Sequence, residues 1–137
     1  MGVKIRLVYI ERIIMASLIV TSGDKKGDYY PLGHRTNVIG RDEGLLIQIL
    51  DEHISRKHMQ IGFDKDKEQY YALDMKSKHG VFINGSKIGN ETALADCDQI
   101  HIGQTDLLFT EKDFADGESA LSYYKKVGER IRPTMID

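Results

Sequence analysis

The sequence predicts an all-β protein, specifically a two-sheet antiparallel β-sandwich. Short segments rich in Val, Ile, Leu and aromatic residues follow one another closely, with turn sequences such as SGDKKGD, GRDEG and FDKDKE between them. Apolar and polar residues alternate most clearly in HMQIGF and QIHIG, as expected of strands with one buried face. Short strands at this spacing favour antiparallel sheets packed face to face over alternating strands and helices.

Each expected strand is short and contains β-branched, leucine or aromatic residues. The turns that follow are rich in Gly, Asp, Asn, Ser and Lys; NGSKIGN and GQTD mark the last two. In chain order the expected strands span residues 17–21, 29–32, 37–40, 45–50, 58–63, 69–75, 81–85, 99–103 and 105–110.

The two ends of the chain differ from this central domain, which we place at residues 15–112. Residues 1–14 alternate charged and apolar residues. They either add an edge strand or form a dispensable extension, with Met15 as the physiological start. Residues 113–137 lose the strand pattern. We expect a short helix there, followed by a flexible end.

The expected C-terminal helix rests on apolar spacing and on charge order. Acidic residues come first in this segment and Lys125, Lys126 and Arg130 come later, an order that suits a helix dipole. The apolar residues with near-helical spacing are Leu121, Tyr124, Val127 and Ile131. Such a helix would pack on the domain or on a partner.

Composition and charge exclude several functional classes. Apolar residues make up 41% and charged residues 29% of the chain, a balance typical of a soluble globular domain. The net charge is −2, so no overall field attracts nucleic acid or an anionic membrane. The apolar stretch IIMASLIV is far shorter than the roughly 20 residues needed to span a bilayer.

The expected compartment is the cytoplasm. Charged residues interrupt the apolar N-terminal stretch, and no clean cleavage pattern for a signal peptide follows it. The single cysteine, Cys97, excludes an intrachain disulfide and fits a reducing environment. Cys97 lies between two aspartates, and this acidic setting argues against a reactive role.

Three separated stretches carry the candidate binding chemistry. They are Gly40-Arg41, SRKH at 55–58 and SKHGVFING at 77–85, and all three fall at the ends of expected strands. Loops at one edge of a sandwich can meet in space, and binding groups are usually found on such loops. We therefore expect these stretches to form one site.

The side chains in these stretches suit a phosphate group. Arg41 offers a planar fork of donors, Ser55 offers a hydroxyl, and Arg56 and Lys78 add positive charge. Glycines in the same stretches allow tight turns that expose backbone amides. A phosphorylated residue carries a charge of about −1.5 to −2 and three strong acceptor oxygens.

In their order and spacing these residues resemble the forkhead-associated (FHA) domain family. The segment LADCDQIHIG resembles the one near the end of the family pattern, with Cys97 where a glycine is usual. The resemblance covers roughly residues 17–112. The matching positions are Gly40, Arg41, Ser55, His58, Asp74, Ser77, Gly80, Ile83, Asn84 and Gly85.

The resemblance implies a β-sandwich that binds phosphothreonine peptides through loops at one end, without catalysis. Arg41 would hold the phosphate or the adjacent peptide backbone, Ser55 would donate its hydroxyl, and Arg56 would add a donor. His58 would brace the loops that carry Ser55 and Arg41, and Lys57 would face solvent. The residues expected to support the site are Gly40, His58, Ser77, Gly80, Asn84 and Gly85, with Asn84 mainly a turn residue.

Two positions depart from the family pattern. Lys78 stands where the family has a threonine that contacts phosphate, and a lysine can supply a longer, less directional charge. His79 stands where the family has an asparagine that clamps the peptide main chain. An imidazole can donate or accept one such bond, but it cannot do both as an amide does. Lys78 and His79 are nevertheless expected to contact the peptide.

The implied partner is a phosphothreonine-containing protein, either a Ser/Thr kinase or a substrate of one. An alternative is a scaffold of the same fold that binds proteins without phosphate. A hydrolase using Ser55 and His58 is disfavoured because no third residue is evident to orient the histidine. No cofactor or metal is expected, since the histidines lack zinc-site spacing.

The tail suggests one further hypothesis. Thr134 is followed three residues later by Asp137. In the FHA family the third position after the phosphothreonine is often the selective one, and aspartate is among the residues found there. A phosphorylated Thr134 would then dock into the loops of its own or a neighbouring chain, giving self-association. An ordinary frayed terminus is the simpler interpretation.

Overall fold

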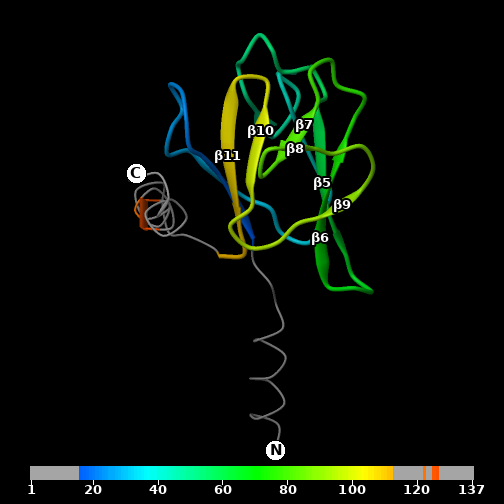
Figure 1. The fold of residues 1–137 in the computed structure, drawn as a ribbon. Helices are drawn as coiled ribbons and strands as arrows, with labels where there is room; N and C mark the ends of the chain where they lie inside the picture. The colour runs from blue at the N-terminus through cyan, green and yellow to red at the C-terminus, as the bar shows by residue number, and fades with distance from the viewer. Residues whose placement is uncertain (1–15, 113–121, 123–124, 127–137) are drawn as a thin grey trace, which may run out of the picture.

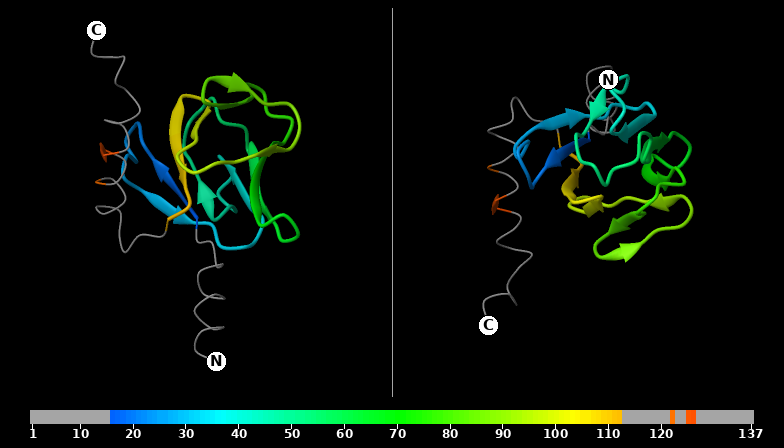
Figure 2. Two further views of the ribbon diagram at one scale, coloured as in Figure 1. Left: turned by 60° about the horizontal axis from the view of Figure 1, so that its bottom comes forward. Right: turned by 90° about the horizontal axis from the view of Figure 1, so that it is seen from above.

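The structure is a computed structural model that describes residues 16–112 and, beyond them, residues 122, 125 and 126. Two sheets pack face to face, which confirms the predicted β-sandwich (Figures 1 and 2). The strands of the first sheet, in spatial order, are β2 (Tyr29–Pro31), β1 (Ser17–Val20), β11 (Thr105–Thr110), β10 (Gln99–Ile102), β7 (Val81–Ile83) and β8 (Ser86–Lys87). Those of the second are β4 (Ile47–Gln48), β3 (Asn37–Gly40), β5 (Met59–Asp64), β6 (Gln69–Asp74) and β9 (Thr92–Ala93).

One strand pair departs from the expected antiparallel arrangement. β3 and β4 are parallel, with Ile39 beside Ile47. Parallel neighbours usually need a long crossover connection. Here only residues 41–46 connect the two strands, and β4 itself has only 2 residues. The chain turns at Asp42, whose carbonyl accepts the Leu45 amide (3.2 Å), and then returns beside β3.

The expected strand at 45–50 is therefore wrong over most of its length. The leucines on either side of β4 are exposed to solvent, Leu46 by 84% and Leu50 by 74%. The strands β8 and β9 were not predicted, because 2 residues each are too few to show an alternating pattern. The remaining strands agree with the sequence prediction to within a few residues.

The core lies between the sheets and is built by strand alternation. Leu18 and Val20 of β1 and Phe109 of β11 point into the same buried cluster as Tyr70 of β6. Ile19 and Leu108, which alternate with them, form a second buried cluster with Cys97 partly buried beside it. Cys97 has a φ of 71°, in the left-handed region that usually favours glycine.

The ends of the chain remain predictions. Residues 1–14, the domain boundaries at 15 and 112 and the tail residue Thr134 lie at or beyond the limits of the described residues. Of the expected C-terminal helix, Ser122, Lys125 and Lys126 are helical and exposed. Its four apolar residues lie outside the described part of the chain. Among the described residues, no helix has the length and apolar character required to cross a bilayer.

The sandwich brings three loops to one end. The chain leaves β3 at Gly40, enters β5 at Met59 and passes from β6 to β7 through residues 75–80. In Figure 1 these loops lie at the upper end, whereas the turn between β5 and β6 lies at the lower end. Figure 2 (right) views the loop end from above.

Candidate functional site

Residues from each of the three predicted stretches line one pocket of about 480 Å³. Four of the five predicted ligand residues, Arg41, Ser55, Lys78 and His79, line it. Sequence reasoning had not assigned the other three lining residues, Glu52, His53 and Ile54, to the site. We call this the phosphate pocket, because the groups that line it suit an anion. They come from three loops that are far apart in the sequence.

His58 fastens two of these loops from within the protein. Its ring is fully buried, and Nδ1 accepts a hydrogen bond from the Ser55 amide (3.0 Å). Because Nδ1 is an acceptor, the ring proton lies on Nε2, which donates to the Gly80 carbonyl (2.8 Å). The same imidazole thus sets the distance between the Ser55 loop and the Gly80 loop.

The Ser55 hydroxyl adds a second link between the loops. Its Oγ accepts a hydrogen bond from the Lys78 amide (3.0 Å). A hydroxyl has one proton to donate as well as lone pairs to accept. Since Oγ is already an acceptor for Lys78, its proton is available to an acceptor in the pocket.

Ser77 shapes the turn that carries Lys78 and His79. Its hydroxyl donates to the Asp74 carboxylate (2.5 Å) and accepts from the Gly80 amide (2.9 Å). Gly80 has a φ of 88°, which glycine adopts without strain. Lys78 and His79 are exposed on this turn. Ser77 and Gly80 therefore support the site from behind, while the two residues between them face outward.

Arg41 is held at its base and leaves its outer nitrogens for a ligand. Its amide donates to the Ser55 carbonyl (3.1 Å), and its Nε donates to the Ile54 carbonyl (3.0 Å). Ile54 is buried and anchors its loop in the core. Among the described residues, no hydrogen bond is recorded for the terminal guanidinium nitrogens of Arg41. A preorganised fork of this kind matches a phosphate or carboxylate.

Gly40 is required by close packing. A Cβ on this residue would lie 2.1 Å from the Arg56 carbonyl oxygen and 3.0 Å from that of Ser55. The backbone of the Ser55 loop passes directly over Gly40, which is how the Arg41 and Ser55 loops come together. The Gly-Arg pair thus combines a close approach with a candidate ligand-binding group.

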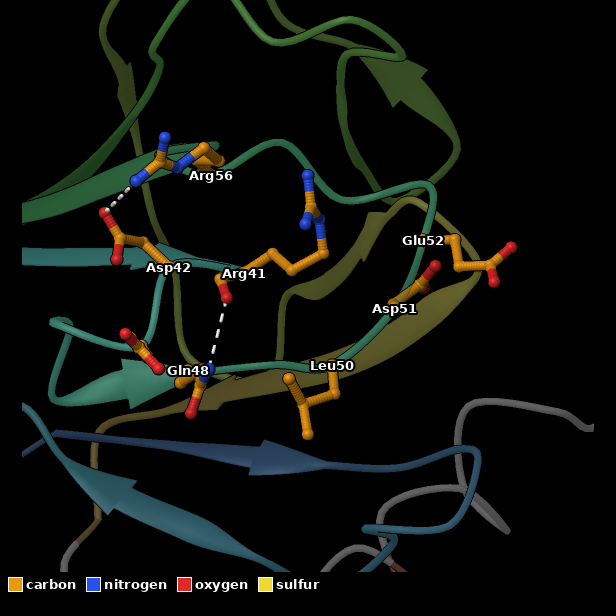
Figure 3. Close-up of a pocket in the computed structure, with 8 residues that line it drawn as sticks. Arg41, Asp42, Gln48, Leu50, Asp51, Glu52 and Arg56 are labelled. Atoms are coloured by element: carbon orange, nitrogen blue, oxygen red, sulfur yellow. Dashed lines mark hydrogen bonds and ion pairs between the residues drawn. The ribbon is translucent and has the colours of Figure 1, made fainter.

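Arg56 lies in an adjoining pocket rather than in the phosphate pocket. Its guanidinium pairs with the Asp42 carboxylate (3.5 Å) and is 75% exposed (Figure 3). A hydrogen bond from the Gly44 amide, together with the Arg56 charge, holds the pKa of Asp42 below its usual value. Arg56 would have to leave Asp42 to reach a ligand in the phosphate pocket.

Asn84 and Gly85 lie away from the phosphate pocket, at the other end of β7. Their φ values of 50° and 87° suit a tight hairpin turn between β7 and β8. The Asn84 side chain donates to the Asp98 carboxylate (2.9 Å) and accepts from the Gln99 amide (2.9 Å). The geometry is that of a turn residue.

Asp51 was not singled out from the sequence, yet it ties the Ser55 loop to the β10–β11 turn. One carboxylate oxygen accepts the His53 amide (2.8 Å). The other accepts the Gln104 amide (2.7 Å) and the Thr105 hydroxyl (2.8 Å). No sequence signal identifies this role, because Gln104 lies 53 positions away.

We predict that Asp51→Asn weakens the acid dependence of folding stability. Burial raises the pKa of the Asp51 carboxyl, but hydrogen bonds from the His53 and Gln104 amides and from Thr105 outweigh it, so the net pKa is lowered. The ionised carboxyl therefore adds stability above the unfolded pKa of about 3.9, and this is lost as pH falls through the lower folded pKa.

Chemical denaturation of the wild type and Asp51→Asn between pH 3 and pH 7 would measure this dependence, with the exposed Asp24→Asn as the control. The wild type should lose more stability on acidification than Asp51→Asn. Parallel pH profiles would contradict the assignment of this carboxylate.

The rings of His53 and His79 face each other across the pocket rim, with centroids 5.5 Å apart and planes tilted by 53°. The place of His53 beside His79 could not be read from the sequence. No cluster of three or more metal-binding side chains occurs within the described residues. The two rings form a wall of the phosphate pocket.

Comparisons with known proteins agree with this geometry. Residues 37–103 match a sequence model described as the FHA domain. The chain is similar to the oxoglutarate dehydrogenase inhibitor of Corynebacterium jeikeium, with 31% identity over 94 residues, covering 69% of this chain and 63% of that protein. It is also similar to the FHA domain-containing protein FhaA of Mycobacterium tuberculosis, with 28% identity over 92 residues, covering 67% of this chain and 17% of that protein.

A solved structure described under phosphothreonine-dependent FHA domain interactions superposes with a TM-score of 0.64 and 25% identity. The match covers 73% of this chain and 99% of that structure. The chain thus spans less than two thirds of the length of either curated relative, while it matches nearly the whole of this solved domain.

Proposed function

This chain contains a forkhead-associated (FHA) domain, and we propose that it binds phosphothreonine-containing segments of partner proteins. The observation that carries this proposal is the convergence of Arg41, Ser55 and Lys78 on one pocket. These three side chains come from different loops, and a buried histidine holds two of those loops together. The solved structure with phosphothreonine-dependent interactions supports the same ligand class.

The proposed contacts follow from the free donors. The outer nitrogens of Arg41 and the Ser55 proton would donate to phosphate oxygens, and Lys78 would add a mobile positive charge. Hydrogen bonds to charged groups contribute about 1.5–3 kcal/mol each. Two or three of them, with backbone contacts, support micromolar affinity, near −8 kcal/mol. This strength suits reversible adaptor binding in Ser/Thr kinase signalling.

FHA domains are binding modules, and we propose that this chain has no hydrolytic activity of its own. Ser55 and His58 are the residues a hydrolase would use. The acceptor nitrogen of His58 is engaged by the Ser55 amide, and its other nitrogen donates to Gly80 (2.8 Å). The buried ring therefore offers no free nitrogen to take the Ser55 proton.

The proposal is tested by calorimetric titration with degenerate peptide pools. Pools centred on phosphothreonine, phosphoserine and unmodified threonine would be compared at equal concentration. We expect binding to the phosphothreonine pool alone. Absence of binding to all three pools would overturn the proposal. It would favour a phosphate-independent scaffold, the alternative suggested by Lys78 and His79 at the rim.

We predict that Arg41→Ala weakens phosphopeptide binding about 30-fold, since one charge-assisted contact of about 2 kcal/mol is removed. Ser55→Ala should weaken binding as well, because its hydroxyl supplies one donor and also accepts the Lys78 amide that links the two loops. The exposed Lys57→Ala serves as the control and should bind as the wild type does. Equal affinities of Arg41→Ala and the wild type would contradict the assigned role of Arg41.

A further inference from the structure

A second pocket, of about 450 Å³, adjoins the phosphate pocket and shares Arg41 and Glu52 with it. In Figure 3 the Arg41 side chain extends between Arg56 and the segment that carries Asp51 and Glu52. We call this second pocket the flank pocket. Its lining residues are Arg41, Asp42, Glu43, Gln48, Leu50, Asp51, Glu52 and Arg56.

The charge changes sign between the two pockets. The phosphate pocket combines the cations Arg41 and Lys78 with one carboxylate, that of Glu52. The flank pocket is lined by four carboxylates and only two guanidinium groups, so negative charge is in excess. A ligand that spans both pockets would therefore be expected to carry a negative group at one end and a positive group at the other.

Two of the four carboxylates are available to a ligand. Asp42 is paired with Arg56, and Asp51 is engaged by backbone amides and Thr105. Glu43 and Glu52 are exposed. No hydrogen bond or ion pair of their carboxylates is recorded within the described part of the chain. These two side chains supply the negative charge that an incoming cation would meet.

Leu50 adds an apolar surface to the same pocket. It is one of two large hydrophobic residues that are strongly exposed in the described structure, at 74%. Lysine and arginine have long apolar stems with a charged head, and they pack the stem on apolar surface while the head stays polar. A pocket with an exposed leucine and free carboxylates matches that combination.

We propose that the flank pocket binds a lysine or arginine side chain of the same phosphopeptide whose phosphate occupies the neighbouring pocket. This inference rests on the proposed function and deepens it. The preferred ligand is a phosphothreonine segment with a basic residue nearby. Leu50 receives the stem of that residue, and Glu43 and Glu52 face its charge.

The test uses peptide libraries with phosphothreonine fixed. Arginine, lysine, alanine or glutamate is placed at one position at a time on either side, and the remaining positions are degenerate. At one position we expect arginine and lysine to bind about threefold more tightly than alanine and about tenfold more tightly than glutamate. The preference should shrink at high salt, because exposed charge pairs are screened.

The variant that tests the source of the preference is the double change Glu43→Lys with Glu52→Lys. We expect it to reverse the preference, so that glutamate binds more tightly than arginine at the same position. Since Glu52 also lines the phosphate pocket, binding of every phosphopeptide can tighten. The ratio between the arginine and glutamate libraries is therefore the readout. Glu91→Lys, an exposed carboxylate that lines a different pocket, is the control and should leave the ratio unchanged.

The outcomes separate this inference from the proposed function. Equal binding of the arginine, alanine and glutamate libraries at every position, with phosphothreonine dependence intact, overturns the inference alone. A preference for basic residues that survives the double change also overturns it. Loss of phosphothreonine dependence in the wild type overturns the proposed function, and the inference falls with it.

Discussion

Replacing His58 with alanine is expected to reduce the unfolding free energy by about 4 kcal/mol and to abolish measurable phosphopeptide binding. The ring is fully buried and satisfies the Ser55 amide and the Gly80 carbonyl. Its removal leaves both backbone groups without partners and opens a cavity between the loops, and these losses together account for a change of that size. The Ser55 hydroxyl and the Lys78 amide then lose their fixed separation.

Urea denaturation of His58→Ala beside Lys57→Ala measures the stability change, and calorimetry at a temperature where the variant is folded measures binding. Lys57 is the exposed sequence neighbour, so its replacement should leave both properties near wild type. A folded His58→Ala variant with wild-type affinity would show that the loops hold their geometry without the imidazole.

Gly40→Ala is expected to reduce the unfolding free energy by about 3 kcal/mol and to weaken phosphopeptide binding at least tenfold. The new Cβ would lie 2.1 Å from the Arg56 carbonyl, a backbone atom that cannot rotate away. Forcing the strands and loop apart costs energy as overpacking does. The displaced segment carries Ser55, and the adjacent residue is Arg41, so both ligand groups move.

Thermal unfolding and peptide titration of Gly40→Ala should be compared with Gly89→Ala. No heavy atom lies within 4 Å of a Cβ at Gly89, so alanine there should be tolerated. Equal stability of the two variants would mean that the Ser55 loop relaxes without loss. The proposed link between Gly40 packing and the site would then be wrong.

These predictions share a physical basis. Among the groups proposed to touch phosphate, Arg41 and Lys78 are exposed and Ser55 is half-buried, and hydrogen bonds to the protein interior hold their loops. Arg41 is fixed by the Ile54 carbonyl, and the Ser55 loop is fixed by His58 and Asp51. A site built in this way loses little conformational entropy on binding, which favours affinity from only a few contacts.

The two departures from the family pattern also gain a structural meaning. Lys78 keeps its position through its backbone amide, which bonds to Ser55 Oγ at 3.0 Å whatever its side chain is. Its ammonium group is therefore available to contact a negatively charged ligand. The His79 ring packs near the His53 ring, and an imidazole cannot both donate and accept as an amide does. The flank pocket is our candidate for a further contact that fixes the peptide register.

The sequence by itself determined the sandwich, the order of most strands and the loops that carry the site. Alternation and turn residues act locally, so strands such as β5, β6 and β11 could be predicted almost to the residue. Gly40-Arg41, Ser55 and Lys78 follow expected strand ends, and this alone predicts that they lie in neighbouring loops.

Only the tertiary structure decided how those loops are fastened and what lies beside them. The Asp51 bond to Gln104 spans 53 positions, and the parallel pairing of β3 with β4 brings Gln48 and Leu50 to the pocket next to Arg41. Neither follows from local propensity, because both depend on which distant segments the packed sheets bring together. The sequence names the groups that we propose bind phosphate, and the packing of the sheets decides which residues surround them.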